Sequence, residues 1–141
     1  MSIKSYLEID TLPGFLGGGT ISVDAVELFY PATKTKVQGL RIEVRKNEDI
    51  TGVSFVDIDE INGLLKGIDY IAKELGEGCK FKMFEANYRT KSGFEITVFN
   101  ESDSTISCTI TSGIASIHGD VSAIQRLRSL INKGNAALIA K

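Results

Sequence analysis

Two groups of basic side chains, each next to a tyrosine, are the residues of this chain with the clearest potential for chemistry. Positive charges neutralise phosphates while aromatic rings stack on bases, which is what a single-stranded nucleic acid needs from its binding site. The alternative is that the charges are solvated hairpin tips and that both tyrosines belong to the core. The candidate nucleic-acid-binding residues are Tyr30, Lys34, Lys36, Arg41, Arg45, Tyr88, Arg89 and Lys91.

The lone histidine, His118, and the strand-like segment that holds Cys108 are the nearest approach to a catalytic pair. A nucleophilic cysteine needs a base and an accessible, electropositive setting. Cys108 lies instead between Ser107 and Thr109 in an alternating strand pattern, which favours a buried thiol. We therefore predict no catalytic residue and no enzymatic activity.

Three acids, Asp57, Asp59 and Glu60, lie together before an apolar helical pattern. Such a cluster could hold Mg²⁺ or Ca²⁺ if a further carboxylate, such as Asp24 or Asp49, joined it. Acids are also favoured at helix N-termini, where they accept hydrogen bonds from free amides. We expect capping, and we predict no metal site and no cofactor.

A glycine-rich segment, residues 14–19, resembles a phosphate-binding loop only superficially, because no lysine is present and a strand-like run follows it. Leu12, Phe15 and Leu16 give the segment an apolar character. It is expected to be a flexible or tightly folded loop, with an interaction arm as one interpretation.

Length and composition limit the possible classes of protein. The chain has 141 residues, 43% of them hydrophobic and 24% charged, with a net charge of −2. A sequence pI near 5.4 argues against a broadly basic nucleic-acid binder but not against a local basic patch. Cys79 and Cys108 are expected to be buried thiols. No signal peptide or apolar run of about 20 residues is visible, so a cytoplasmic location is expected.

The second half of the chain repeats the pattern of the first. Residues 26–30 (VELFY) return as 84–88 (FEANY), and the helical pattern at 60–73 returns at 120–133. An internal repeat constrains the whole fold. Its halves are placed at residues 1–76 and 77–134 of a single domain, residues 1–141.

Hydrophobic periodicity predicts four strands and a helix in each half. The helices come after strand meanders, so the fold class is α+β: duplicated β-β-β-β-α units, with antiparallel sheets and two helices sharing one core. A change of apolar phase between Ala25 and Val26 predicts a bulge, with a counterpart between Met83 and Phe84. Strands are expected at 3–10, 20–30, 40–45, a segment ending near 57, 79–88, 94–100, 105–111 and 114–118. Helices are expected at 57–75, ended by Gly76, and at 120–133, ended by Gly134, with a polar loop at 31–38.

Two β-β-β-β-α units in one chain resemble the Whirly family of single-stranded-DNA-binding transcriptional regulators. The resemblance covers most of the chain and is one of topology. The lysine- and glycine-containing strand motif of plant Whirly proteins has no counterpart in the predicted sheets. The resemblance implies single-stranded nucleic acid as a partner.

The function predicted from the sequence is a non-enzymatic binding module that is a homo-oligomer. Its partner is single-stranded nucleic acid, bound through the basic hairpins. The alternative is a protein-interaction or assembly module without nucleic-acid binding, favoured by the acidic pI, an exposed Phe99 and the apolar glycine-rich loop. No membrane contact is expected.

Overall fold

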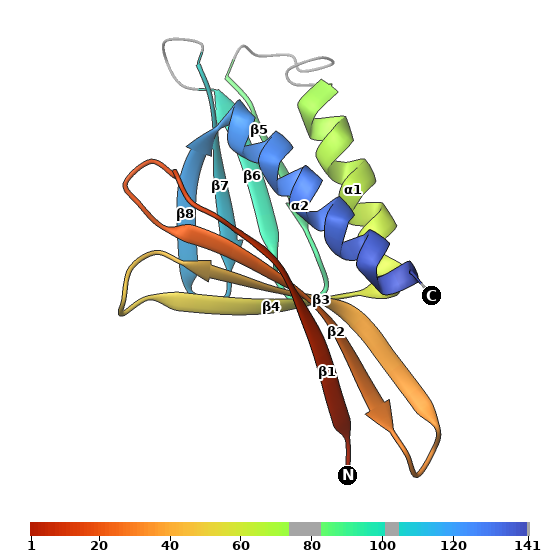
Figure 1. The fold of residues 1–141 in the computed structure, drawn as a ribbon. Helices are drawn as coiled ribbons and strands as arrows, with labels where there is room; N and C mark the ends of the chain where they lie inside the picture. The colour runs from red at the N-terminus through yellow and green to blue at the C-terminus, as the bar shows by residue number, and fades with distance from the viewer. Residues whose placement is uncertain (74–82, 101–104, 141) are drawn as a thin grey trace.

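The computed structural model describes residues 1–73, 83–100 and 105–140 and contains two antiparallel four-stranded sheets, each followed by a helix (Figure 1). This confirms the predicted α+β fold with duplicated β-β-β-β-α units. Strand order follows chain order in both sheets. The first unit comprises β1 (Ile3–Leu12), β2 (Thr20–Tyr30), β3 (Thr35–Arg45), β4 (Thr51–Asp57) and α1 (Ile58–Lys73), and the second comprises β5 (Glu85–Arg89), β6 (Glu95–Asn100), β7 (Ile106–Ser112), β8 (Ala115–Asp120) and α2 (Val121–Ile139).

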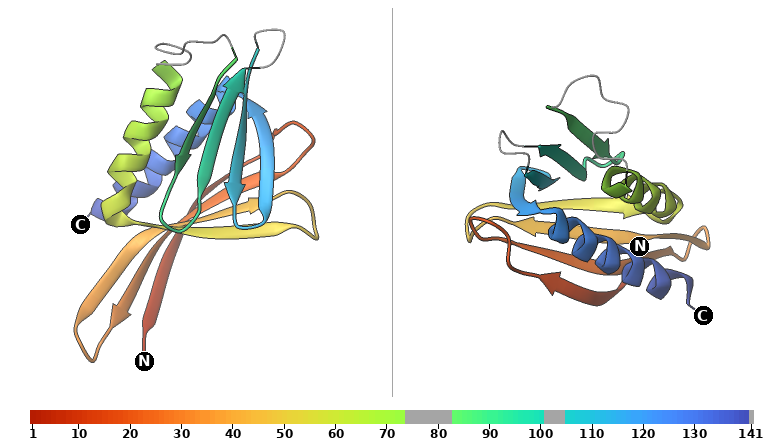
Figure 2. Two further views of the ribbon diagram at one scale, coloured as in Figure 1. Left: turned by 180° about the vertical axis from the view of Figure 1, so that it is seen from behind. Right: turned by 90° about the horizontal axis from the view of Figure 1, so that it is seen from above.

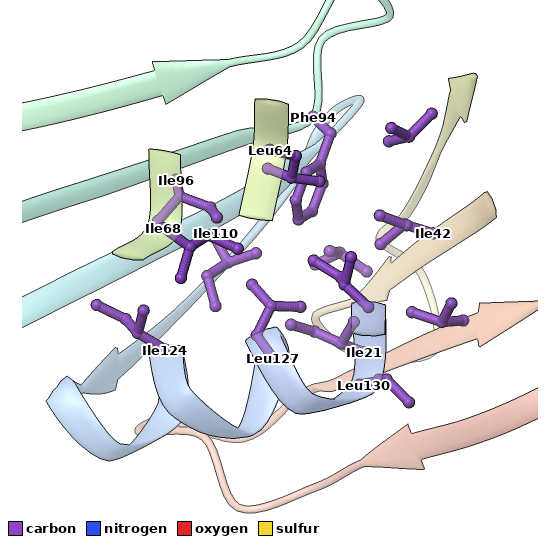
Figure 3. Close-up of a cluster of buried hydrophobic side chains, with 14 of the residues drawn as sticks. Ile21, Ile42, Leu64, Ile68, Phe94, Ile96, Ile110, Ile124, Leu127 and Leu130 are labelled. Atoms are coloured by element: carbon purple, nitrogen blue, oxygen red, sulfur yellow. The ribbon is translucent and has the colours of Figure 1, made fainter. Parts of the chain in front are cut away.

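One hydrophobic core joins both sheets and both helices. Each helix contacts strands of each sheet, and the helices contact each other. Figure 3 shows Leu64 and Ile68 of α1, Ile124 and Leu127 of α2 and Phe94 meeting in this core, and all five side chains are fully buried. On the surface, Arg128 of α2 donates two hydrogen bonds to the Asp69 carboxylate of α1.

The two sheets join where the β7–β8 turn meets β3 and β4. A Cβ atom on Gly52 of β4 would lie 1.6 Å from the Ser112 carbonyl oxygen, so only glycine allows this approach. The buried Ser112 hydroxyl lies 2.5 Å from the Ser54 hydroxyl and donates to the Ile42 carbonyl oxygen at 3.0 Å. These bonds satisfy the polar groups that the junction removes from water.

The first unit carries an extension that the second lacks. Strands β2 and β3 have 11 residues each, against 6 and 7 in their counterparts β6 and β7. Figures 1 and 2 show the N-terminal half of β1 and the β2–β3 hairpin reaching past the helices and the second sheet, with the N-terminus and the hairpin turn at the far end. We call this extension, residues 3–7 and 26–38, the arm.

The bulge predicted between Ala25 and Val26 is wrong. Strand β2 pairs with β3 without a register shift, and its shift against β1 arises on β1, between Glu8 and Asp10. Ala25 and Val26 are both buried although successive strand residues point to opposite faces. The apolar phase changes because β2 leaves the helices here and buries Val26 on the opposite face. The counterpart at Met83 and Phe84 lies before β5 begins.

Two predicted boundaries are also wrong. Helix α2 continues past Gly134 to Ile139. Gly134 is buried, and a Cβ atom there would lie 2.6 Å from a Leu40 methyl group. Glycine here lets the helix approach β3 closely instead of ending it. The turn after β2 is only four residues long, so β3 begins at Thr35, within the segment expected to be loop. The helix stop predicted at Gly76 and the first residues of the predicted strand at 79–88 lie outside the described residues.

The glycine-rich loop is tightly folded. All its glycines have positive φ, from 78° at Gly17 to 106° at Gly19, a region that residues with a side chain seldom adopt. This path brings the Phe15 side chain into the core, where it is 5% exposed, and leaves Leu16 63% exposed. Arg126 of α2 fixes the loop by donating to the Pro13 carbonyl oxygen at 2.9 Å.

Candidate interaction surface

The predicted basic residues of the first unit lie on β3 and on the turn that precedes it. Lys34 is in the turn, with a positive φ of 55°, and its side chain is exposed. Tyr30, at the end of β2, is 37% exposed, and Lys36 follows at the start of β3. These three residues form the tip of the arm.

Most of these basic side chains lie within ion-pair distance of acids. Lys36 Nζ is 3.8 Å from the Glu27 carboxylate. Arg41 is 3.8 Å from Asp24 and 3.3 Å from Glu43, and Arg45 is 3.3 Å from the same Glu43. The strand therefore carries alternating charges that offset one another locally, and the potential available to a phosphate is weaker than the count of basic residues suggests.

The basic residues of the second unit lie elsewhere. Figures 1 and 2 show the β2–β3 turn at the end of the arm, whereas the β5–β6 turn lies against the first unit. The Lys91 backbone N–H donates to Glu60 of α1 at 2.8 Å, and the Ser92 hydroxyl donates to the Phe55 carbonyl oxygen of β4. Arg89 lies 4.0 Å from Glu95. The two basic hairpins do not form a common surface.

Tyr88 packs on α1. A Cβ on Gly67 would lie 2.4 Å from its ring, and one on Gly63 would lie 3.2 Å from its hydroxyl oxygen. These two glycines create a flat site on the helix for the tyrosine ring. Tyr88 therefore serves the packing between sheet and helix, whereas Tyr30 lies at the surface.

His118 and Cys108 lie on opposite faces of the second sheet. His118 pairs with Thr109, and its Nδ1 atom lies 3.1 Å from the Thr109 hydroxyl on the exposed face. Cys108 points into the core, where burial, with a smaller effect of the Asp120 carboxylate, raises the pKa of its thiol to about 11. This geometry does not produce a thiolate–imidazole pair. Cys79 lies outside the described residues.

The acids at the start of α1 act as hydrogen-bond acceptors for the backbone. Asp57 accepts from the Asp59 N–H at 3.2 Å, and Glu60 accepts from Lys91. The matching aspartate before α2, Asp120, accepts from the Ala123 N–H at 3.3 Å, and its bond from the Ser122 hydroxyl is the main cause of its lowered pKa. No group of three or more potential metal ligands occurs in the parts of the chain that the structure describes.

The sheet edges differ in how they are protected. At strand β4, Gly52 lies against the β7–β8 turn, and the Phe55 carbonyl oxygen accepts a hydrogen bond from the Ser92 hydroxyl. At β8, the Leu16 N–H donates to the His118 carbonyl oxygen at 2.9 Å. Strand β5 is only five residues long. Strand β1 has ten residues, lies at the end of its sheet, and has no second strand paired to it among residues 1–73, 83–100 and 105–140.

The exposed edge strand carries large apolar side chains. Ile3 is 51% exposed, Tyr6 64% and Leu7 58%. The sequence pattern placed Ile3, Leu7 and Ile9 on one face of the strand and Tyr6 on the other, but it gave no sign that this strand would lie at a sheet edge. Sequence reasoning therefore missed these residues as a surface. Two aromatic residues that the sequence suggested for an interaction surface are less exposed than expected. Phe99 is half-buried, and Phe15 lies in the core.

The fold and this surface define an α+β protein with two meander–helix units and a long edge strand, β1, that carries exposed apolar side chains. Comparisons of the chain with protein-family models, with curated proteins and with solved structures each find no match. Within the described residues, neither helix has the length and apolar character needed to cross a membrane.

Proposed function

We propose that this protein is a non-enzymatic assembly module and that the arm is its contact surface. The observation that carries the proposal is the long, open edge of β1 with its exposed apolar side chains. An unprotected edge strand presents a row of free N–H and C=O groups, which pair readily with a strand of another chain. Proteins normally protect such edges with proline, charged side chains, bulges or short strands. Strand β1 carries Lys4, Glu8 and a register shift after Glu8, yet residues 3–8 form a regular stretch, whereas β4 and β8 are contacted by Ser92 and Leu16 and β5 has only five residues.

The arm also offers apolar surface beside the C-terminal end of α2. Tyr6 of β1 pairs with Val26 of β2, which is 3% exposed, and both line a hollow with Ala137 and Leu138 of α2. Leu28 and Val37 continue this face toward the hairpin turn and are half-buried. A projecting strand pair with exposed apolar side chains is typical of a contact surface.

Mass measurement tests this function. In sedimentation equilibrium, we expect the mass of the wild-type protein to rise from 15.3 kDa, the mass of one chain, toward twice that value as concentration increases. Tyr6→Lys should shift this transition to higher concentration by at least about tenfold, since it puts a charge at the centre of the exposed strand. Val53→Lys is the matched control, because Val53 is 46% exposed on β4, away from this edge. A wild-type protein that stays monomeric at several hundred micromolar would refute the proposal.

Single-stranded nucleic acid is the second candidate, confined to the arm. The observation in its favour is that Tyr30, Lys34 and Lys36 are exposed together at the tip. Lys4 also lies 5.7 Å above the Tyr6 ring on the same arm. Bases could stack on these rings while the lysines meet phosphates.

The separation of the two hairpins gives this candidate a sharp test. If the arm binds an oligonucleotide, replacing Lys34 and Lys36 by Gln should reduce affinity about tenfold or more and lower its dependence on salt. Replacing Arg89 and Lys91 by Gln should leave affinity unchanged, because that hairpin lies against β4 and α1. Fluorescence anisotropy with a labelled oligonucleotide at low salt measures both. Equal losses in the two double variants would contradict an arm-specific site, and no binding by the wild-type protein would exclude this candidate.

A further inference from the structure

The exposed face of β1 carries charges that have no ion-pair partner among the described residues. In the described part of the chain Lys4 has no ion pair, and its ammonium group lies over the Tyr6 ring. Glu8 pairs across the sheet with Asp24, a like charge. Like charges directly opposite each other destabilise a sheet.

The surroundings of Glu8 reinforce this imbalance. Glu8, Asp10, Asp24 and Glu43 line one hollow on this face, together with a single cation, Arg41. Arg41 is already shared between Asp24 and Glu43. A cation arriving from outside at the free edge beside Glu8 would therefore meet an electrostatic field that favours it.

The geometry of antiparallel pairing restricts how two copies of β1 can meet. Along a strand, alternate residues direct both their N–H and C=O groups to the free edge. In an antiparallel pair, two residues that lie opposite each other both direct these groups toward the partner strand or both direct them away. In two identical strands, opposite residues are therefore an even number of positions apart in the sequence, and the two-fold axis passes through a residue rather than between two. The regular part of β1 ends at the register shift after Glu8, which leaves residues 3–8 for pairing.

Within that segment, one register matches charges. With the axis at Tyr6, Lys4 lies opposite the partner's Glu8, Ser5 opposite the partner's Leu7, and Tyr6 opposite the partner's Tyr6. Symmetry then provides two Lys–Glu pairs, one on each side of a central tyrosine pair. With the axis at Ser5, Lys4 faces a tyrosine instead, and with the axis at Leu7 the pairing would cross the irregular segment between Glu8 and Asp10.

We infer that two copies of this chain join by antiparallel pairing of their β1 strands, with the two-fold axis at Tyr6, so that the two first-unit sheets become one continuous eight-stranded sheet. This inference rests on the proposed assembly function and specifies its partner and contact. The edge supplies backbone hydrogen bonds, and the Lys4–Glu8 pairs set the register. The cation that the acidic hollow lacks is then Lys4 of the partner subunit.

Charge-reversal variants test the register. Lys4→Glu and Glu8→Lys each create two like-charge pairs, so each alone should raise the dimer Kd by about tenfold or more. An equimolar mixture of the two variants restores both pairs in the mixed dimer. There the introduced glutamate of one chain meets the introduced lysine of the other, and the unchanged Glu8 meets the unchanged Lys4. We expect the mixed dimer to form with a Kd within about threefold of the wild-type value. Native mass spectrometry with one isotope-labelled variant distinguishes mixed from like dimers.

The matched control is Asp10→Lys, which reverses an acid of the same strand outside the regular segment. It should not form a preferred mixed dimer with Lys4→Glu. Lys4, Glu8 and Asp10 are all exposed, so circular dichroism and thermal melting should show that each variant folds like the wild type.

The outcomes separate this inference from the function on which it rests. A preferred mixed dimer of Lys4→Glu with Glu8→Lys supports the register. A wild-type dimer that Lys4→Glu leaves unchanged, or a mixed dimer preferred with Asp10→Lys instead, overturns the register and leaves the assembly function standing. A wild-type protein that is monomeric at every concentration overturns both.

Discussion

Phe15→Ala should lower the free energy of unfolding by about 3–5 kcal/mol, the usual cost of removing a buried phenylalanine. Its side chain is 5% exposed and lies under the guanidinium group of Arg126, 5.5 Å from the ring centre. Domains have a total stability of about 5–15 kcal/mol, so the variant would lose a large part of it. Urea unfolding followed by circular dichroism measures the change.

The neighbouring residue provides the control for this prediction. Leu16 is 63% exposed, and Leu16→Ala keeps the backbone bond to His118. Its effect should stay within about 0.5 kcal/mol. Equal effects at the two positions would mean that the glycine-rich loop does not place Phe15 in the core, and the loop would then be a surface feature.

Leu64→Ala and Ile124→Ala should each lower the free energy of unfolding by about 2–5 kcal/mol. These residues belong to α1 and α2, and both are completely buried in the core that the helices share. Figure 3 shows them entering it from different helices. Because the core joins the two units, we also expect each variant to unfold in a single transition.

Two probes test this cooperativity. Circular dichroism at a helix wavelength and the intrinsic fluorescence of the tyrosines should give the same denaturation midpoint in each variant. A change below about 0.5 kcal/mol at either position, or two separated transitions, would contradict one shared core.

The sequence predicted the fold class because its periodic signals are strong. The stripe through Ile61, Leu64 and Ile68 and the alternation through Leu40, Ile42 and Val44 leave few other arrangements. All six of these side chains are completely buried. The sequence repeat matched the two helices correctly, but it aligned residues 26–30 of β2 with residues 84–88 of β5, one strand out of step with the units of the structure, in which β2 corresponds to β6.

The predicted helix end and the predicted bulge were wrong because the same sequence signal can have two structural causes. Glycine ends many helices, but Gly134 lies inside α2 because Leu40 needs the space beside it. A change in apolar phase often signals a bulge, but in β2 it marks the point where the strand leaves the helices. Both distinctions depend on which element lies above the residue, and that information is not local in the sequence.

The candidate site was the hardest feature to predict. The basic residues were found as a group in sequence, yet tertiary structure separates Lys34 and Lys36 from Arg89 and Lys91 and places Tyr88 against α1. The exposed edge of β1 was missed because strand order and the length of the arm decide it. The alternating charges along residues 4–8 can be read from the sequence, but the proposal that they pair with a second copy depends on the position of β1 at the sheet edge.

Amide hydrogen exchange measured at two protein concentrations tests most directly that β1 is the contact strand. In an isolated chain, the amides of β1 that point to the free edge should exchange quickly. Under conditions that favour assembly, peptides from β1 should exchange more slowly, whereas peptides from β4 should be unaffected because its edge is already covered. Exchange in β1 that is the same at low and high concentration, in a sample whose mass shows a dimer, would contradict the account.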